Sequence, residues 1–363
     1  MISSGLDIYH YTLPFGRPVR IREHVLKNRS GIIIILKDEL DNFGAGEIAP
    51  LPGLHSESLK DVLNQLKNLK KQLIGTKINI ENTQNAFICF ELLKKDNLYP
   101  SVSFGLESAI CNLLCMRREI ELNKLISKNA HNEIAINALL HANDENLEEQ
   151  IQQLIREGFE AVKLKVGRHD IHKEIRFVRQ VGEWIDGKAN IRLDANRAWT
   201  LKQAVEFAKG IDGISVDYIE EPLSDFSAMK SFYERTNLAV ALDESMTDIS
   251  FNILKGKTWL KAVIIKPPVV GGIQKTFELI DWAEQQNIFP VISDVFFSGV
   301  GLSMLINIAA CVKKKIPMGL ETYNRLQEDL LQKRIEFSNG KIRRNENKKG
   351  QMINFELLKK IDI

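Results

Sequence analysis

The chain has 363 residues, of which 44% are hydrophobic and 26% are charged, and its formal net charge is +2. This composition is typical of a globular protein, and the near balance of charge argues against a nucleic-acid or anionic-membrane binder. Four cysteines are too few for a disulfide framework. The N-terminus lacks a signal-peptide pattern, and the longest aliphatic run, Ile32–Leu36, is too short to span a bilayer, so we expect a cytoplasmic protein.

The first part of the chain predicts a small α+β domain. Short β-like runs at Ile21–Val25 and Gly31–Leu36 are followed by a glycine-rich turn at Asn42–Gly46. Helical patterns then occur near Glu57–Leu73 and Ser103–Met116. Strands followed by helices are typical of the α+β class. We place this domain at residues 1–115.

From about Glu133 onward, two kinds of sequence segment alternate regularly. Short apolar runs alternate with amphipathic stretches, which indicates parallel strands joined by crossover helices. The predicted strands are Ile134–Leu140, Val162–Val166, Ile191–Asp194, Tyr218–Glu220, Ala239–Asp243, Ala262–Lys266, Pro290–Ser293 and Pro317–Leu320. Eight such strands favour a closed α/β barrel. An open doubly wound sheet is the alternative, but no glycine-rich turn follows the first strand.

The end of the chain, after about Lys333, is polar and basic. Acidic and apolar residues interrupt the basic ones, so a solvated surface segment is favoured over a nucleic-acid tail. We expect its last part, Met352–Leu358, to pack on the N-terminal domain. The predicted units are therefore residues 1–115, a barrel at 116–325 and a C-terminal segment at 326–363.

Charged residues gather where the predicted barrel strands end. Each is separated from the next by 23 to 29 residues, about one strand–helix repeat, which places them at the rim where barrel active sites lie. They are Lys165, Asp194, Glu220, Asp243 and Lys266. A single acidic residue after a strand is more often a helix N-cap. Charged residues on successive strands are much harder to explain as caps.

Lys163 belongs to the same rim, because it is two residues from Lys165 on one strand and so shares its face. Charges inside a barrel need counter-ions. The three carboxylates supply them but repel one another, and a bound divalent cation would relieve that repulsion. Three hard oxygen ligands suit Mg²⁺, for which Mn²⁺ could substitute. Lys266 should face this metal from the side opposite Lys165.

This arrangement is suited to removing a proton next to a carboxylate. Mg²⁺ on a substrate carboxylate would stabilise the enediolate that forms. A lysine close to Mg²⁺ and to another cation has a lowered pKa, so it can act as a base near neutral pH. Lys165, Lys266 and Lys163 are the candidate catalytic residues.

The pattern resembles the enolase superfamily. In that superfamily, the use of a lysine base together with Mg²⁺ is already established. Lys163-x-Lys165, Asp194, Glu220, Asp243 and Lys266 match its muconate-lactonizing subgroup. More narrowly, the chain is similar to o-succinylbenzoate synthases of the proteobacterial type. The strings that carry this likeness are Leu26–Gly31, Gly44–Gly53, Pro100–Gly105, Arg192–Thr200, Glu220–Pro222 and Asp243–Ser245.

The resemblance implies a modified (β/α)₇β barrel under a capping domain formed by both ends of the chain. It implies Mg²⁺-dependent syn-dehydration of 2-succinyl-6-hydroxy-2,4-cyclohexadiene-1-carboxylate to o-succinylbenzoate in menaquinone synthesis. By the same resemblance, Asp194, Glu220 and Asp243 would bind Mg²⁺, and Lys165 would act as the acid–base catalyst. Lys266 would stabilise the enediolate, and Lys163 would adjust the pKa of Lys165. Asn196 and Arg192 would support these residues without touching the substrate, which Ser293 and Gly319 would contact.

The loop Ser293–Gly301 departs from the expected serine-rich string, and Asp294 is unexpected beside a dianionic substrate unless it points away. Two other functions stay open. One is an N-acylamino acid racemase or dipeptide epimerase of the same superfamily, which would use both lysines as bases. The other is a non-catalytic binding protein on the same scaffold. The expected partner is a small-molecule carboxylate, and the sequence does not decide between a monomer and a homo-oligomer.

Overall fold

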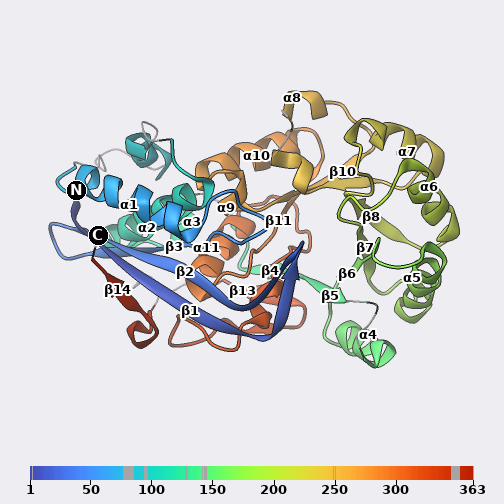
Figure 1. Ribbon diagram of the computed structural model, residues 1–363, viewed down its shortest axis with the longest axis horizontal. Helices are drawn as coiled ribbons and strands as arrows, with labels where there is room; N and C mark the ends of the chain where they lie inside the picture. The colour runs from blue at the N-terminus through green and yellow to red at the C-terminus, as the bar shows by residue number, and fades with distance from the viewer. Residues whose placement is uncertain are drawn as a thin grey trace.

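The computed structural model describes the chain except residues 2, 77–85, 94–96, 127–129, 141, 143–144, 248, 250, 345–351 and 363. It contains a parallel barrel and an antiparallel sheet that carries both ends of the chain (Figure 1). Within the described residues, no helix is both long and apolar enough to cross a membrane.

The barrel is built from parallel strands that follow one another in chain order. They are β5 (Asn137–Leu140), β6 (Ala161–Lys165), β7 (Asn190–Asp194), β8 (Val216–Glu220), β9 (Val240–Leu242), β10 (Leu260–Ile265) and β11 (Phe289–Ile292). The predicted eighth strand closes the ring through two parallel bridges, one from Met318 to Ile136 and one from Gly319 to Ser293. The α/β barrel predicted from the sequence is therefore confirmed.

Helices cover the outside of the barrel because their apolar faces pack on its buried strands. They are α4 (Leu147–Arg156), α5 (Ile171–Ile185), α6 (Leu201–Gly210), α7 (Met229–Thr236), α8 (Phe251–Leu254), α10 (Ile273–Gln285) and α11 (Gly299–Ala310). The single-turn helix α9 (Pro267–Val270) follows β10 and packs on α2 (Pro100–Arg118) of the cap. Their starts are marked in the sequence: Thr200 and Gln203 form a capping box at α6, and Asp170 caps α5. Short 3₁₀ turns lie at Ala86–Leu93, Phe226–Ala228, Glu244–Thr247, Glu321–Arg325 and Phe355–Leu357.

The first predicted barrel strand, Ile134–Leu140, is in fact two strands. Its first half, β4 (Glu133–Ala135), pairs with β13 (Lys341–Arg343) instead, which in turn pairs with β12 (Phe337–Ser338). Part of the C-terminal segment, predicted to be a solvated surface segment, is thereby paired in a sheet. Lys348 and Lys349 of this segment lie outside the described residues. Arg344 is buried and hydrogen-bonds Glu121 and Asn132.

The cap contains a four-stranded sheet and the helices α1 (Leu59–Leu73), α2 (Pro100–Arg118) and α3 (Leu122–Ile126). The sheet order is β14 (Lys359–Ile361), β1 (Ser3–Ile21), β2 (His24–Asp38) and β3 (Phe43–Ile48). In Figure 1 the long hairpin of β1 and β2 extends from the left, where both chain ends lie, toward the barrel. Phe355, near the C-terminus, contacts the ring of Tyr9 edge-on.

Two short-range predictions for the cap are wrong. The run Ile21–Val25 is the tip of the hairpin, because Arg22 has a left-handed φ of 51° and breaks the extended backbone. The glycine-rich stretch is not a turn but most of β3, which packs closely on α2. A Cβ at Gly46 would overlap the carbonyl oxygen of Gly105. These glycines therefore allow close packing of a strand and a helix.

A buried carboxylate from the cap sheet joins the cap to the barrel. Glu47 on β3 accepts hydrogen bonds from the backbone and hydroxyl of Ser298 and from the backbone of Gly301, at the start of α11. Tyr11 also donates to Glu47. Burial raises the pKa of Glu47, although these donors oppose that shift. The cap therefore contacts the barrel at the end where the helices begin.

Candidate active site

Strand register brings the predicted site residues to one rim of the barrel. Lys165 on β6 is level with Asp194 on β7, and Asp194 is level with Glu220 on β8. Asp243 and Lys266 directly follow β9 and β10. Because alternate residues of a strand share a face, these positions meet inside the C-terminal end of the barrel.

The lysines and carboxylates form a chain of ion pairs across this rim. Lys163 Nζ lies 2.8 Å from Asp194 Oδ2 and 2.7 Å from Glu220 Oε2. Lys165 Nζ lies 2.5 Å from Asp194 Oδ2, and Lys266 pairs with Asp243. Asp194 and Glu220 are almost fully buried. The structure therefore brings together all three predicted lysines and all three predicted carboxylates.

The donor chemistry of this cluster fits a hard divalent cation. Three carboxylates end successive strands, and beside them Glu244 Oε2 is buried without a hydrogen-bond partner in the part of the chain that the structure describes. Each carboxylate contacts a lysine, and no ready-made group of three or more metal-ligating side chains is found among the described residues. Metal binding at Asp194, Glu220 and Asp243 thus stays a prediction, which requires these side chains to turn from the lysines to the ion.

The charges of the cluster shift the pKa values of its members. Burial lowers the pKa of Lys163, but Asp194, Glu220 and Asp243 outweigh burial and raise that pKa well above its usual value. The pKa of Lys266 is raised in the same way, chiefly by Asp243. Burial, together with Asp194, raises the pKa of Glu220. A lysine can become a neutral base here only if further positive charge offsets these carboxylates.

A second layer of polar side chains holds the cluster in place. Asn196 accepts a hydrogen bond from Lys165 at 2.9 Å and donates to Glu244 at 3.1 Å. Its supporting role in catalysis stays a prediction. Glu221 accepts the backbone N–H groups of Asp243 and Ser245 at 2.9 and 2.8 Å. It thereby fixes the backbone at the predicted ligand Asp243.

Arg192 has different partners. It donates to Pro317 O at 2.6 Å and to Asp217 at 3.2 Å, and its guanidinium lies over the Tyr218 ring. These contacts join β7 to the closing strand of the barrel. The support of the site by Arg192 stays a prediction. Burial raises the pKa of the hydroxyl of Tyr218, whose ring lies under this guanidinium, above its usual value.

The predicted substrate-contact residues lie where the barrel closes. The N–H groups of Ser293 and Gly319 already donate to Ile265 O and Ile292 O, both at 2.9 Å. A substrate contact there would use the hydroxyl of Ser293. Asp294 is buried and accepts from the Thr322 hydroxyl at 2.6 Å, so its carboxylate holds the loop together. Burial raises the pKa of Asp294 to about 6.

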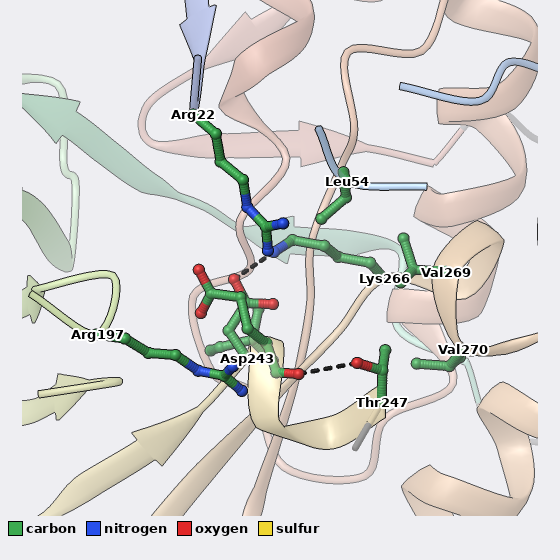
Figure 2. Close-up of a pocket in the computed structure, with 10 residues that line it drawn as sticks. Arg22, Leu54, Arg197, Asp243, Thr247, Lys266, Val269 and Val270 are labelled. Atoms are coloured by element: carbon green, nitrogen blue, oxygen red, sulfur yellow. Dashed lines mark hydrogen bonds and ion pairs between the residues drawn. The ribbon is translucent and has the colours of Figure 1, made fainter. Parts of the chain in front are cut away.

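A pocket opens beside Lys266 and Asp243 and is lined by both the cap and the barrel. Figure 2 shows Arg22 pointing into it from the hairpin tip, and Lys266 lines the same pocket from the barrel. Leu54 of the cap also lines it. The sequence analysis missed Arg22, because its place depends on how far the hairpin reaches over the barrel.

Two family models match the chain. Residues 4–113 match the model described as "MenC, N-terminal domain", and residues 146–351 match "Enolase C-terminal domain-like". The o-succinylbenzoate synthase of Aliivibrio fischeri is 30% identical over 87% of this chain and 89% of that protein. Protein PHYLLO, chloroplastic, of Arabidopsis thaliana is 32% identical over 84% of this chain, which spans only 20% of that longer protein.

Solved structures share the fold at lower identity. A muconate lactonizing enzyme from Pseudomonas fluorescens has a TM-score of 0.86 at 18% identity and covers 98% of both chains. An N-succinyl Arg/Lys racemase from Bacillus cereus has a TM-score of 0.86 at 21% identity and covers 100% of both chains. From the family models and the sequence relatives together, the chain belongs to the o-succinylbenzoate synthase family of the enolase superfamily.

Proposed function

We propose that this protein is an o-succinylbenzoate synthase that dehydrates 2-succinyl-6-hydroxy-2,4-cyclohexadiene-1-carboxylate. The observation that carries the proposal is the cluster at the barrel rim, where Lys165 and Lys266 come from well-separated strands and flank three buried carboxylates. The family relationship supports the choice of substrate.

In the proposed reaction, the neutral amine of Lys165 takes the proton next to the substrate carboxylate. The resulting ammonium returns a proton to the departing hydroxide on the same face, so that the C–O bond breaks and water leaves. Lys266 faces the substrate from the other side, where its positive charge stabilises the electron-rich intermediate. Lys163 lies between Asp194 and Glu220 and restrains both carboxylates.

Asp194, Glu220 and Asp243 would hold Mg²⁺, as in the enolase superfamily generally. When bound, the ion supplies positive charge that stabilises the enediolate and lowers the pKa of nearby lysines. Asn196 keeps Lys165 aimed at the reacting carbon through its 2.9 Å hydrogen bond. Arg22 and the Ser293 hydroxyl are the groups we assign to the carboxylates of the substrate.

The direct test is to incubate the purified protein with the cyclohexadiene substrate and Mg²⁺ and to measure o-succinylbenzoate. We expect turnover that stops when the metal is chelated and returns when Mg²⁺ or Mn²⁺ is added. Lys165→Ala should lower kcat at least a thousandfold while leaving the circular dichroism unchanged. Lys173→Ala, at an exposed lysine on α5, is the matched control and should keep full activity.

A second candidate function is racemisation of N-succinyl or other N-acyl amino acids. It is favoured by the same two lysines, because a racemase needs a base on each face of its substrate. Incubation of an N-succinyl amino acid in deuterium oxide would reveal it as exchange of the α-proton with inversion. Racemisation without any dehydration would overturn the proposed function.

A further inference from the structure

We infer that two side chains of the cap, His55 and Glu107, are positioning residues for Lys266. Their side chains hydrogen-bond to the backbone of residues 266–274, which we call the Lys266 segment. The inference rests on the proposed function, in which Lys266 stabilises the intermediate.

The Lys266 segment has little rigidity of its own. It consists of Lys266, the single-turn helix α9, two glycines, Gly271 and Gly272, with left-handed φ values of 113° and 102°, and the first two residues of α10. The carbonyl oxygen of Lys266 accepts the N–H groups of Val269 and Val270 at 2.8 and 3.0 Å. Any movement of α9 therefore moves the backbone that carries the lysine.

His55 holds the middle of this segment. Its Nδ1 accepts the N–H of Leu51 at 3.0 Å, so the ring proton must be on Nε2. Nε2 lies 3.2 Å from the carbonyl oxygen of Pro268 and donates to it. The neutral imidazole thus uses both of its nitrogens, one within the cap and one across to α9.

Glu107 holds the end of the segment. It lies on α2, and its Oε2 accepts the N–H groups of Ile273 and Gln274, the second at 3.1 Å. These N–H groups begin α10, whose N-cap residue Gly272 has no side chain to satisfy them. A Cβ on Gly272 would lie 2.7 Å from Glu107 Oε2. The glycine therefore leaves room for a capping carboxylate that comes from another domain.

These contacts link the cap to the barrel at a functional point. Helix α2 packs against both α9 and α10. The hydrogen-bonded residues Pro268 and Ile273 lie on either side of Val269 and Val270, which line the pocket. Because the cap lines the same pocket through Arg22 and Leu54, its placement over the substrate also sets the placement of Lys266. Loss of the hydrogen bonds from His55 and Glu107 should lower kcat more than it raises KM.

The experiment compares Glu107→Ala and Glu107→Gln with Asp38→Ala. Asp38 is a matched control, because its buried carboxylate also accepts two backbone N–H groups, those of Leu40 and Asn42, but it lies within the cap. We expect Glu107→Ala to lower kcat about tenfold with KM within twofold, and Glu107→Gln, which keeps an acceptor oxygen, to recover most of kcat. Asp38→Ala should lose stability but keep kcat.

A second pair of variants tests the histidine. His55→Phe keeps a ring without a donor and should lower kcat, whereas His55→Gln can present an N–H to Pro268 and should recover activity. Amide hydrogen exchange, followed by mass spectrometry, gives a readout that does not need turnover. Exchange in residues 269–274 should accelerate in Glu107→Ala and His55→Phe but not in Asp38→Ala.

Either of two kinetic results would overturn the inference. One is an active wild-type protein whose Glu107→Ala and His55→Phe variants keep wild-type kcat, and the other is an Asp38→Ala variant that loses as much kcat at an equal loss of stability. Unchanged exchange in residues 269–274 would also overturn it. Failure of the wild-type protein to dehydrate the substrate would instead count against the proposed function. The exchange experiment would still show whether His55 and Glu107 hold the Lys266 segment in place.

Discussion

His55 and Glu107 should make opposite contributions to the pH dependence of stability. Burial lowers the pKa of His55 to about 4 from an ordinary value of 6.5. Between these values the unfolded chain binds a proton that the folded chain does not, so stability rises with pH. Burial raises the pKa of Glu107 to about 7 from an ordinary value of 4.5. Between these two values the folded chain binds a proton that the unfolded chain does not, so stability falls as pH rises.

Each shift corresponds to about 3 kcal/mol, at roughly 1.4 kcal/mol per pKa unit. The two contributions nearly cancel in the wild-type protein between about pH 4.5 and 6.5. Removing one of them should expose the other. Relative to wild type, His55→Gln should become less stable by about 2 kcal/mol as pH rises from 5 to 6.5, and Glu107→Gln should become more stable by a similar amount.

The assay is urea denaturation of wild type and both variants at several pH values, with the difference in unfolding free energy plotted against pH. Contributions from all other titrating groups cancel in these differences. Difference curves with opposite slopes would support the reasoning. Two flat curves, or two slopes of the same sign, would refute the assigned protonation states.

Three further changes have defined outcomes. Lys163→Met removes the ammonium between Asp194 and Glu220 and should destabilise the metal-free protein by about 3–5 kcal/mol, with Mg²⁺ restoring part of the loss in denaturation experiments. If Mg²⁺ stabilised this variant no more than wild type, the carboxylates would not be its ligands. Arg22→Met should raise KM about tenfold with a smaller change in kcat, through loss of a charge-assisted contact to substrate. An unchanged KM would remove Arg22 from the binding site. Gly46→Ala should destabilise the protein by about 3 kcal/mol or more, because its Cβ would overlap the backbone of α2; a change below 1 kcal/mol in thermal or urea unfolding would contradict this close packing.

The barrel and the polar cluster were predictable because both follow from periodic patterns. Each parallel strand is a continuous apolar run, and strand register alone places Lys165, Asp194 and Glu220 at one level. A single strand–helix repeat fixes their spacing. The positions of these residues therefore required no knowledge of contacts distant in sequence.

The parts that sequence reasoning missed depend on such distant contacts. Gly46 looks like a turn residue until α2 is packed against it. Arg22 looks like part of a strand until the hairpin tip is placed over the barrel (Figure 2). The partners of Arg192 are set by the closing strand, which lies 125 residues further along the chain. Local patterns carry no information on these pairings.

The pairing of β14 with β1 has a consequence for how the protein is made. Ile8 is opposite Ile361 and His10 is opposite Lys359, so the first strand of the cap sheet gains its outer neighbour only when nearly the whole chain has been synthesised. Until then one edge of β1 is unpaired and open to other strands. Closing so long a loop is slow, so the emerging N-terminal hairpin must remain soluble while the barrel is translated and folds. Lys359 and Lys360 add positive charge to β14, which finally pairs with this edge at Ile8–His10.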